Sequence, residues 1–121
     1  MNPVRPFRIT DLLWIESFAK QQNQWERLLE GLATGVMAFV IEPQAVAVIE
    51  RDIHGFTLCG IANLPHVKSA TRLAKFVTGI YRENGVVLHS HDQPGTFGRK
   101  LAEHFGYVED GDAMWLNIGG I

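Results

Sequence analysis

The chain has a single cysteine, no excess of positive charge and no long apolar segment. With Cys59 alone among 121 residues, it cannot form an internal disulfide. Eleven Lys and Arg stand against thirteen Asp and Glu, and the resulting net charge of −2 gives no reason to expect a nucleic-acid partner. The longest strongly apolar run, residues 36–41, is far too short to span a bilayer, so no membrane partner is expected.

Export signals, repeats and linkers are also missing. The first ten residues lack the apolar core of a secretory signal, so we expect a cytoplasmic location. No repeat or low-complexity segment divides the chain. A length of 121 residues with a hydrophobic content of 46% suits one core, and we predict a single domain over residues 1–121.

Hydrophobic periodicity predicts a mixture of strands and helices. The expected elements in chain order are strand 4–10, helix 12–22, helix 24–33, strands 36–42, 45–52 and 55–64, helix 69–84, strand 85–91, helix 96–105 and a closing hairpin over 107–118. Asp11 and Ser69 are expected to cap the helices that follow them. The order β-α-α-β-β-β-α-β-α-β-β indicates an α+β fold. The helix 69–84 between two strands predicts that those two strands are parallel.

This order resembles the GCN5-related N-acetyltransferase (GNAT) superfamily across essentially the whole chain. Two segments can be laid on the family pattern without gaps. In residues 61–77, Pro65 matches the proline at the end of the fourth strand, and Lys68 falls at the Arg or Gln that opens the glycine loop. In residues 95–107, Gly106 and Tyr107 fall at the Gly-Phe that ends the last helix. The resemblance implies a GNAT-like sheet flanked by helices.

The same resemblance implies acetyl-coenzyme A as the cofactor and an amine-bearing small molecule or protein as the acceptor. The backbone of Ile61, Ala62 and Asn63 would pair with the pantetheine arm. The pyrophosphate would lie against Lys68, Ser69, Ala70, Thr71, Arg72 and Leu73. Ser69, Thr71 and Leu73 stand where the family has Gly or Ala. The side chain of Leu73 either crowds the ligand or turns into the core. These substitutions predict weak or absent coenzyme A binding.

The catalytic residues stay unassigned, and a second function competes with acetyl transfer. Ala102 replaces the tyrosine that serves as the acid in the family, and the strand 55–64 carries no carboxylate to act as a base. Glu50 and Asp52 on the preceding strand remain candidates. The alternative is a non-catalytic relative, because the short chain and altered loop resemble small phage-encoded GNAT-like proteins, including internal virion proteins. Its partners would be other proteins or further copies of the chain, and its location the virion.

Two histidines near the end of a predicted strand raise a third possibility. His89 and His91 are two residues apart, so on a strand they share a face, and Asp92 follows them. Such a set can bind zinc, and a zinc hydrolase using His89 and His91 is the most distant of the three functions. A convincing fourth ligand is missing. We therefore interpret the stretch as a strand entering a loop and predict no bound metal.

Overall fold

Seven strands and three long helices make up most of the part of the chain that the computed structural model describes, which comprises residues 2–52, 55–63, 66–83, 88–90, 100, 103–104, 107–110 and 113–116. The helices are η1 (Ile9–Asp11, a 3-10 turn), α1 (Leu12–Gln21), α2 (Trp25–Thr34) and α3 (Val67–Glu83). The strands are β1 (Arg5–Pro6), β2 (Gly35–Ile41), β3 (Ala45–Asp52), β4 (Gly55–Ala62), β5 (Leu88–Ser90), β6 (Tyr107–Asp110) and β7 (Ala113–Leu116). The predicted α+β class is confirmed.

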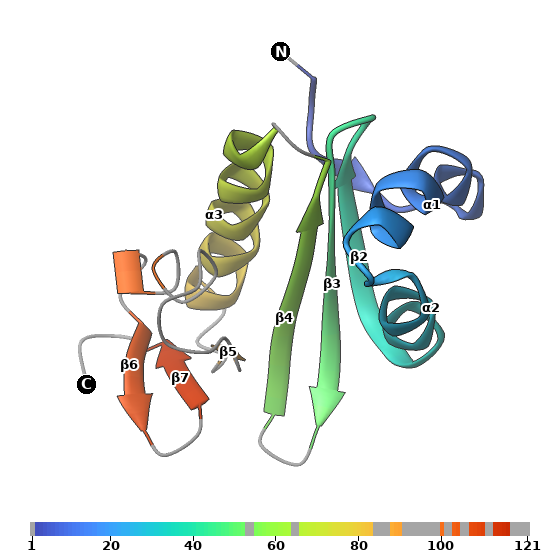
Figure 1. The fold of residues 1–121 in the computed structure, drawn as a ribbon. Coiled ribbons are helices and arrows are strands. Elements are labelled where there is room, and N and C mark those ends of the chain that lie inside the picture. The colour runs from blue at the N-terminus through green and yellow to red at the C-terminus, as the bar shows by residue number, and fades with distance from the viewer. Residues whose placement is uncertain are drawn as a thin grey trace.

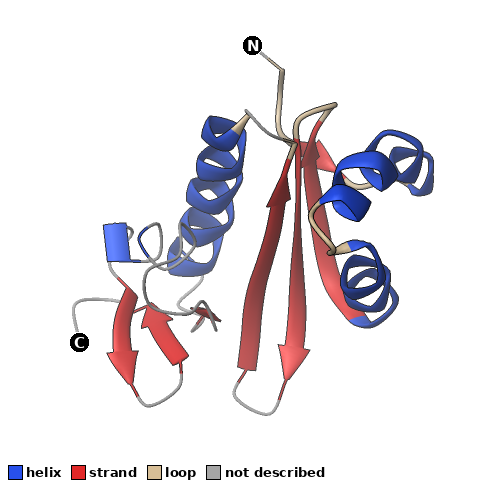
Figure 2. Ribbon diagram, in the orientation of Figure 1, coloured by secondary structure: helices blue, strands red, loops and turns tan. Residues whose placement is uncertain are grey.

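The described strands form one sheet with the order β1-β2-β3-β4-β5-β7-β6. Helices α1 and α2 cover one face of the sheet and α3 covers the other (Figures 1 and 2). Strands β2, β3 and β4 form an antiparallel meander, as the sequence predicts. Strand β5 runs parallel to β4 after the α3 crossover, which confirms the predicted strand-helix-strand unit. The pair β6 and β7 confirms the closing hairpin.

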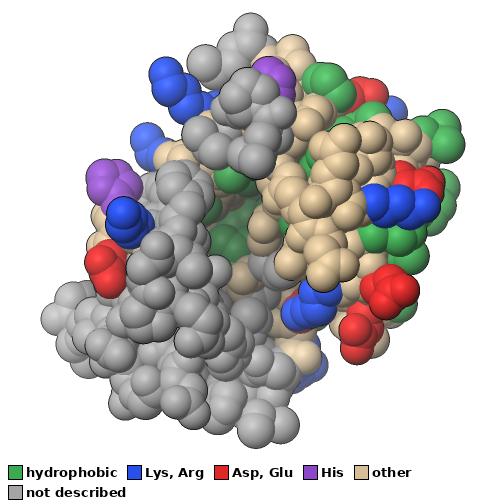
Figure 3. Space-filling view, viewed as in Figure 1, with side chains coloured by type: hydrophobic (Ala, Val, Ile, Leu, Met, Phe, Trp, Pro, Cys, Tyr) green, Lys and Arg blue, Asp and Glu red, His purple; other side chains and the backbone are tan. Residues whose placement is uncertain are grey.

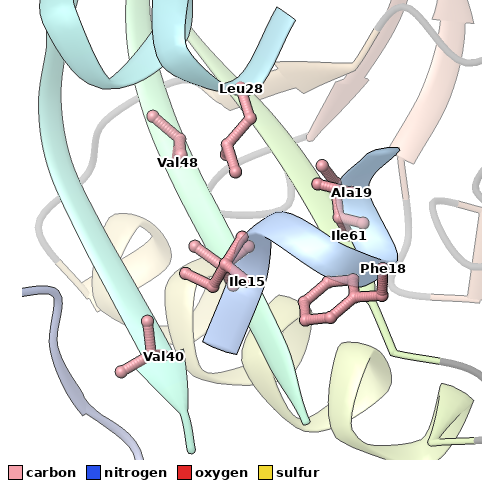
Figure 4. Close-up of a cluster of buried hydrophobic side chains, with 8 residues drawn as sticks. Ile15, Phe18, Ala19, Leu28, Val40, Val48 and Ile61 are labelled. Carbon is pink, nitrogen blue, oxygen red and sulfur yellow. The ribbon is translucent and has the colours of Figure 1, made fainter. Parts of the chain in front are cut away.

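A separate apolar cluster lies on each face of the sheet because successive strand residues point to opposite sides. On the first face, Ile15, Phe18, Ala19 and Leu28 from the two helices meet strand residues that include Val40, Val48 and Ile61 (Figure 4). On the second face, Leu73 of α3 packs with Ile41, Ala45 and Ala47. The two clusters hold the three-stranded meander between its helices.

The predicted first strand is longer than the observed one. Only Arg5 and Pro6 pair with β2, and the chain then turns into η1. The turn arises because the Asp11 carboxylate accepts the backbone N–H of Arg8 at 2.7 Å. The same contact shows that the predicted cap was wrong: Asp11 reaches back to Arg8 and makes no capping hydrogen bond to the backbone N–H groups at the start of α1.

Helix α3 and the described residues of the last helix lie close to their predicted positions. Helix α3 begins at Val67, two residues before the predicted start. Lys100, Glu103 and His104 have helical backbone, in agreement with the predicted last helix. Gly85, the expected end of α3, lies outside the described residues, as do Gly95, Gly98 and Ala102.

Candidate functional site

The edge of β4 that faces away from β3 can be identified from the strand register. Ala45 lies opposite Ala62, and the backbone N–H of Asn63 donates to the Gln44 carbonyl at 2.7 Å. In an antiparallel ladder this pattern makes Ala45 and Ala62 a non-hydrogen-bonded pair. The N–H and C=O of Ala62 therefore point away from β3, and those of Gly60, two residues earlier, do the same.

This result changes the predicted set of pantetheine contacts. Ile61 directs its backbone toward β3, opposite Val46, and its buried side chain joins the α1–α2 core. Asn63 donates its N–H to Gln44 on the same side. Of the three residues predicted from the resemblance, Ala62 alone presents its backbone at the outer edge. Gly60 belongs to that edge and was missed, although its place follows from the two-residue period once the register is known.

The outer edge of β4 leads to the start of α3, where polar contacts connect the two elements. The backbone N–H of His66 donates to the Asn63 carbonyl at 2.7 Å, and that of Ser69 donates to His66 at 3.0 Å. The amides of Val67 and Lys68 precede the first helical hydrogen bond, so they have no carbonyl acceptor within the helix. A ligand lying along the β4 edge would meet these amides next.

Two residues predicted to line the phosphate loop have other roles. Ser69 does not cap α3, because it is buried inside the first turn and its hydroxyl bonds to the Gln44 side chain. Leu73 is 1% exposed and belongs to the core between α3 and the sheet. Of the two orientations left open by the sequence, Leu73 therefore adopts the one that leaves the ligand side uncrowded. Ala70 and Thr71 are half-buried in the first turns of the helix.

Basic side chains follow α3 from its start. Lys68 and Lys75 are exposed and Arg72 is half-buried. Their spacing of four and three residues places them on one side of the helix. Lys and Arg side chains are visible over the α3 side of the molecule in Figure 3. The sole acidic residue of α3 is its last, Glu83. Cations near the N-terminus of a helix are unfavourable because the helix dipole is positive there. A bound anion would offset the charge of these side chains and that of the dipole.

The guanidinium of Arg72 is held by the N-terminal segment. Its Nη2 donates to the Asn2 carbonyl at 2.9 Å, and the Asn2 side chain bonds to the Glu42 carbonyl. Arg72 thus contacts a segment that is itself bonded to the turn between β2 and β3. A phosphate at the start of α3 would share Arg72 with this carbonyl.

Of the two carboxylates that remained candidate bases, Glu50 is committed to an ion pair, and the side chain of Asp52 lies outside the described part of the structure. Glu50 lies on β3, and its two oxygens accept from the two terminal nitrogens of Arg27 at 2.7 and 2.5 Å. The Glu50 side chain is 14% exposed. Such a bidentate pair holds a carboxylate in one orientation. This geometry gives Glu50 a structural role in joining α2 to β3.

A second buried carboxylate fixes the N-terminal segment. Asp11 is 2% exposed and accepts from Arg5 at 2.6 and 3.0 Å and from the Trp14 indole at 2.9 Å. Burial alone would raise the pKa of Asp11, but the hydrogen bonds from Arg5, Arg8 and Trp14 together lower it. The Arg5 guanidinium also contacts Glu42, and its pKa is raised by both carboxylates.

The histidine hypothesis is not decided by the geometry. The backbone of His89 lies in β5 opposite Thr57, whereas His91 and Asp92 lie outside the described residues. Within the described ranges, no three His, Cys, Asp or Glu side chains are close enough together to bind one metal ion. The absence of a metal therefore stays a prediction.

A separate hollow of about 190 Å³ lies beside the start of β2. It is lined by Phe7, Leu32, Gly35, Val36, Met37, Ala38 and Val48. Apart from the Met37 thioether, the lining side chains are hydrocarbon, and none of them can donate or accept a proton in a reaction. The candidate site is therefore assigned to the edge of β4 and the start of α3.

In the described part of the chain, every helix is too short or too polar to cross a bilayer. Comparison with protein-family models, with curated proteins and with solved structures finds no match for this chain.

Proposed function

We propose that the chain is a GNAT-like protein that binds acetyl-coenzyme A along the outer edge of β4 and at the start of α3. The observation that carries the proposal is the continuity of these two surfaces. Gly60 and Ala62 present backbone groups at the edge, and the strand leads to a helix start flanked by Lys68 and Arg72. An arm with amide groups followed by phosphates matches this sequence of contacts.

The reaction supported by this placement is transfer of the acetyl group to an amine. The amine nitrogen would attack the thioester carbonyl, the carbon–sulfur bond would break, and the thiolate would take up the proton released by the amine. The β4 edge would fix the arm, and the helix start with Lys68 would neutralise the phosphates. No proton-transfer residue is assigned.

The first test is calorimetric titration of the protein with acetyl-coenzyme A at physiological salt. The sequence predicts weak or absent binding, but because Leu73 turns into the core and leaves the ligand side uncrowded, we now expect saturable binding. It should weaken about three- to tenfold in Lys68→Gln, because a partly solvated charge-assisted contact is lost. Lys20→Gln is the matched control, since Lys20 lies on α1 across the sheet and pairs with Glu16 at 2.7 Å. Equal weakening in both variants would point to general charge attraction, and no binding by the native protein would contradict the proposal.

A non-catalytic role is the second candidate, and the Arg27–Glu50 pair favours it. That pair engages both oxygens of Glu50 on β3, so Glu50 is poorly placed to act as a base, and β4 includes no acidic residue. In this case the fold would serve assembly with other proteins or with further copies of the chain, in the cytoplasm or within a virion. Thiol release from acetyl-coenzyme A in the presence of amine acceptors separates the candidates, because binding without turnover supports the non-catalytic role.

A further inference from the structure

One side chain already occupies the outer edge of β4. The Gln22 side-chain amide donates from Nε2 to the Ala62 carbonyl at 2.6 Å. Because that carbonyl points away from β3, this contact takes an acceptor that a neighbouring strand or ligand would otherwise use. The contact joins residues 40 positions apart and is partly buried. It has no role in the reaction or in the two apolar clusters.

Gln22 is placed at the edge by the end of α1. It is the C-cap residue of that helix, and its backbone N–H donates to the Phe18 carbonyl at 3.1 Å. Asn23 then adopts a left-handed conformation with φ of 57°, which ends the helix. The N–H of Gln24 returns to Ala19 at 2.8 Å. The position of the Gln22 side chain is thus set by a bonded helix terminus.

We propose that Gln22 is an internal competitor that holds the Ala62 carbonyl until an amide-bearing ligand arm replaces it. This inference rests on the proposed function. A primary amide N–H on an edge carbonyl makes the same kind of bond as an amide N–H of a pantetheine arm. Binding would exchange one amide–carbonyl bond for another, and Gln22, which is half-buried, can turn to solvent. Gln22 therefore lowers the affinity for ligands that carry the arm.

The test compares neighbouring glutamines at the end of α1. Gln21→Ala is the matched control, because Gln21 is exposed whereas Gln22 is half-buried against β4. Gln22→Ala removes the competitor, and Gln22→Met removes the donor while keeping the side-chain length. The probes are acetyl-coenzyme A and adenosine 3′,5′-bisphosphate, which carries phosphates without the arm. Thermal unfolding verifies that each variant is folded.

We expect both Gln22 variants to bind acetyl-coenzyme A about three- to tenfold more tightly. This factor corresponds to the net contribution of one neutral hydrogen bond. Binding of the bisphosphate, and binding of either probe by Gln21→Ala, should not change. If the native protein binds acetyl-coenzyme A and the Gln22 variants bind it with the same or lower affinity, this inference is overturned and the proposed function stays intact. Tighter binding of both probes would overturn the assignment of the effect to the arm. Failure of every form to bind would contradict the proposed function itself.

Discussion

The two faces of the sheet use their charged residues differently. On the side of α1 and α2, the buried carboxylate of Asp11 and the mostly buried carboxylate of Glu50 are matched by arginines from other segments. On the side of α3, the exposed Lys68 and Lys75 follow the helix with no acidic residue before Glu83. The first arrangement joins parts of the chain to one another. The second places positive charge at a helix start with no acidic residue of α3 nearby, an arrangement that would stabilise a bound anion.

The difference separates structural residues from candidate binding residues. A charge that is buried and bidentate is expected to affect folding when it is removed. A charge that is exposed contributes little to folding, so its removal is expected to affect binding instead. Substitutions on each side of this division should therefore differ in their effect on stability, and the largest loss is expected at Leu73.

Leu73→Ala should produce the largest loss of stability. Leu73 lies in the predicted phosphate loop but is 1% exposed in the core beneath α3. We expect the free energy of unfolding to fall by roughly 2–5 kcal/mol, as for other buried leucines. Leu13→Ala is the control, because Leu13 is 85% exposed and should change stability by less than about 0.5 kcal/mol. Urea unfolding measures both, and equal small effects would place Leu73 at the ligand surface.

Asp11→Asn should lower the free energy of unfolding by about 2 kcal/mol. An amide cannot accept from all of Arg5, Arg8 and Trp14, so buried donors lose their partner. Glu42→Gln removes the other carboxylate on Arg5, but the Glu42 side chain is 56% exposed. That control should lower stability by less than about 1 kcal/mol. A larger loss of stability in Glu42→Gln than in Asp11→Asn would show that Glu42, and not Asp11, is the main carboxylate partner of Arg5.

Acid should remove the contribution of Asp11. Because the folded state lowers the pKa of Asp11 below its ordinary value of 3.8, the unfolded state takes up the proton first as the pH falls. The stabilisation is therefore complete above the unfolded pKa and is lost as the pH falls through the folded pKa. Urea unfolding should show that the free energies of unfolding of the native protein and of Asp11→Asn differ less at pH 3 than at pH 7. If the difference in the free energy of unfolding between the two proteins grew in acid, the pKa of Asp11 would be raised on folding and not lowered.

Two helical glycines should give the smallest effects, with opposite signs. A Cβ at Gly31 of α2 would lie 2.8 Å from Glu50 Oε1, whereas one at Gly79 of α3 would have no neighbour within 4 Å. Gly79→Ala should raise stability by about 0.5–1 kcal/mol through helix propensity. Gly31→Ala should lower it by about 1 kcal/mol, because the Arg27–Glu50 pair must move. Thermal unfolding compares the two, and equal gains would show that the ion pair is not fixed.

Much of the fold could be predicted because periodicity is a local property. The continuous apolar, β-branched runs of β2 and β3 are typical of buried strands, and the apolar stripe of α3 marks one side of a helix. The end of β1 was not predictable in this way. It depends on Asp11 folding back to Arg5 and Arg8, and the sequence pattern around Asp11 is equally that of a helix cap.

The candidate site was harder to predict because its contacts join distant segments. Gln22 and Gln44 reach Ala62 and Ser69 across 40 and 25 positions, and no motif marks either glutamine. Ile61 and Leu73 were chosen from the resemblance, but the strand register and the helix face turn both toward the core. A sequence resemblance indicates which elements form a site. The orientation of each side chain follows only from the packed structure.

The most direct test of the site is backbone amide NMR of the labelled protein during titration with acetyl-coenzyme A. We predict that the largest chemical-shift changes occur at Gly60, Ala62, Val67 and Lys68, with the Gln22 side-chain amide changing alongside Ala62. Amides in α2 and at the start of β2 should remain unchanged and act as the internal control. Changes centred on the apolar hollow at Val36 and Met37, or no changes at saturating ligand, would contradict the assignment of β4 and α3 as the coenzyme A site.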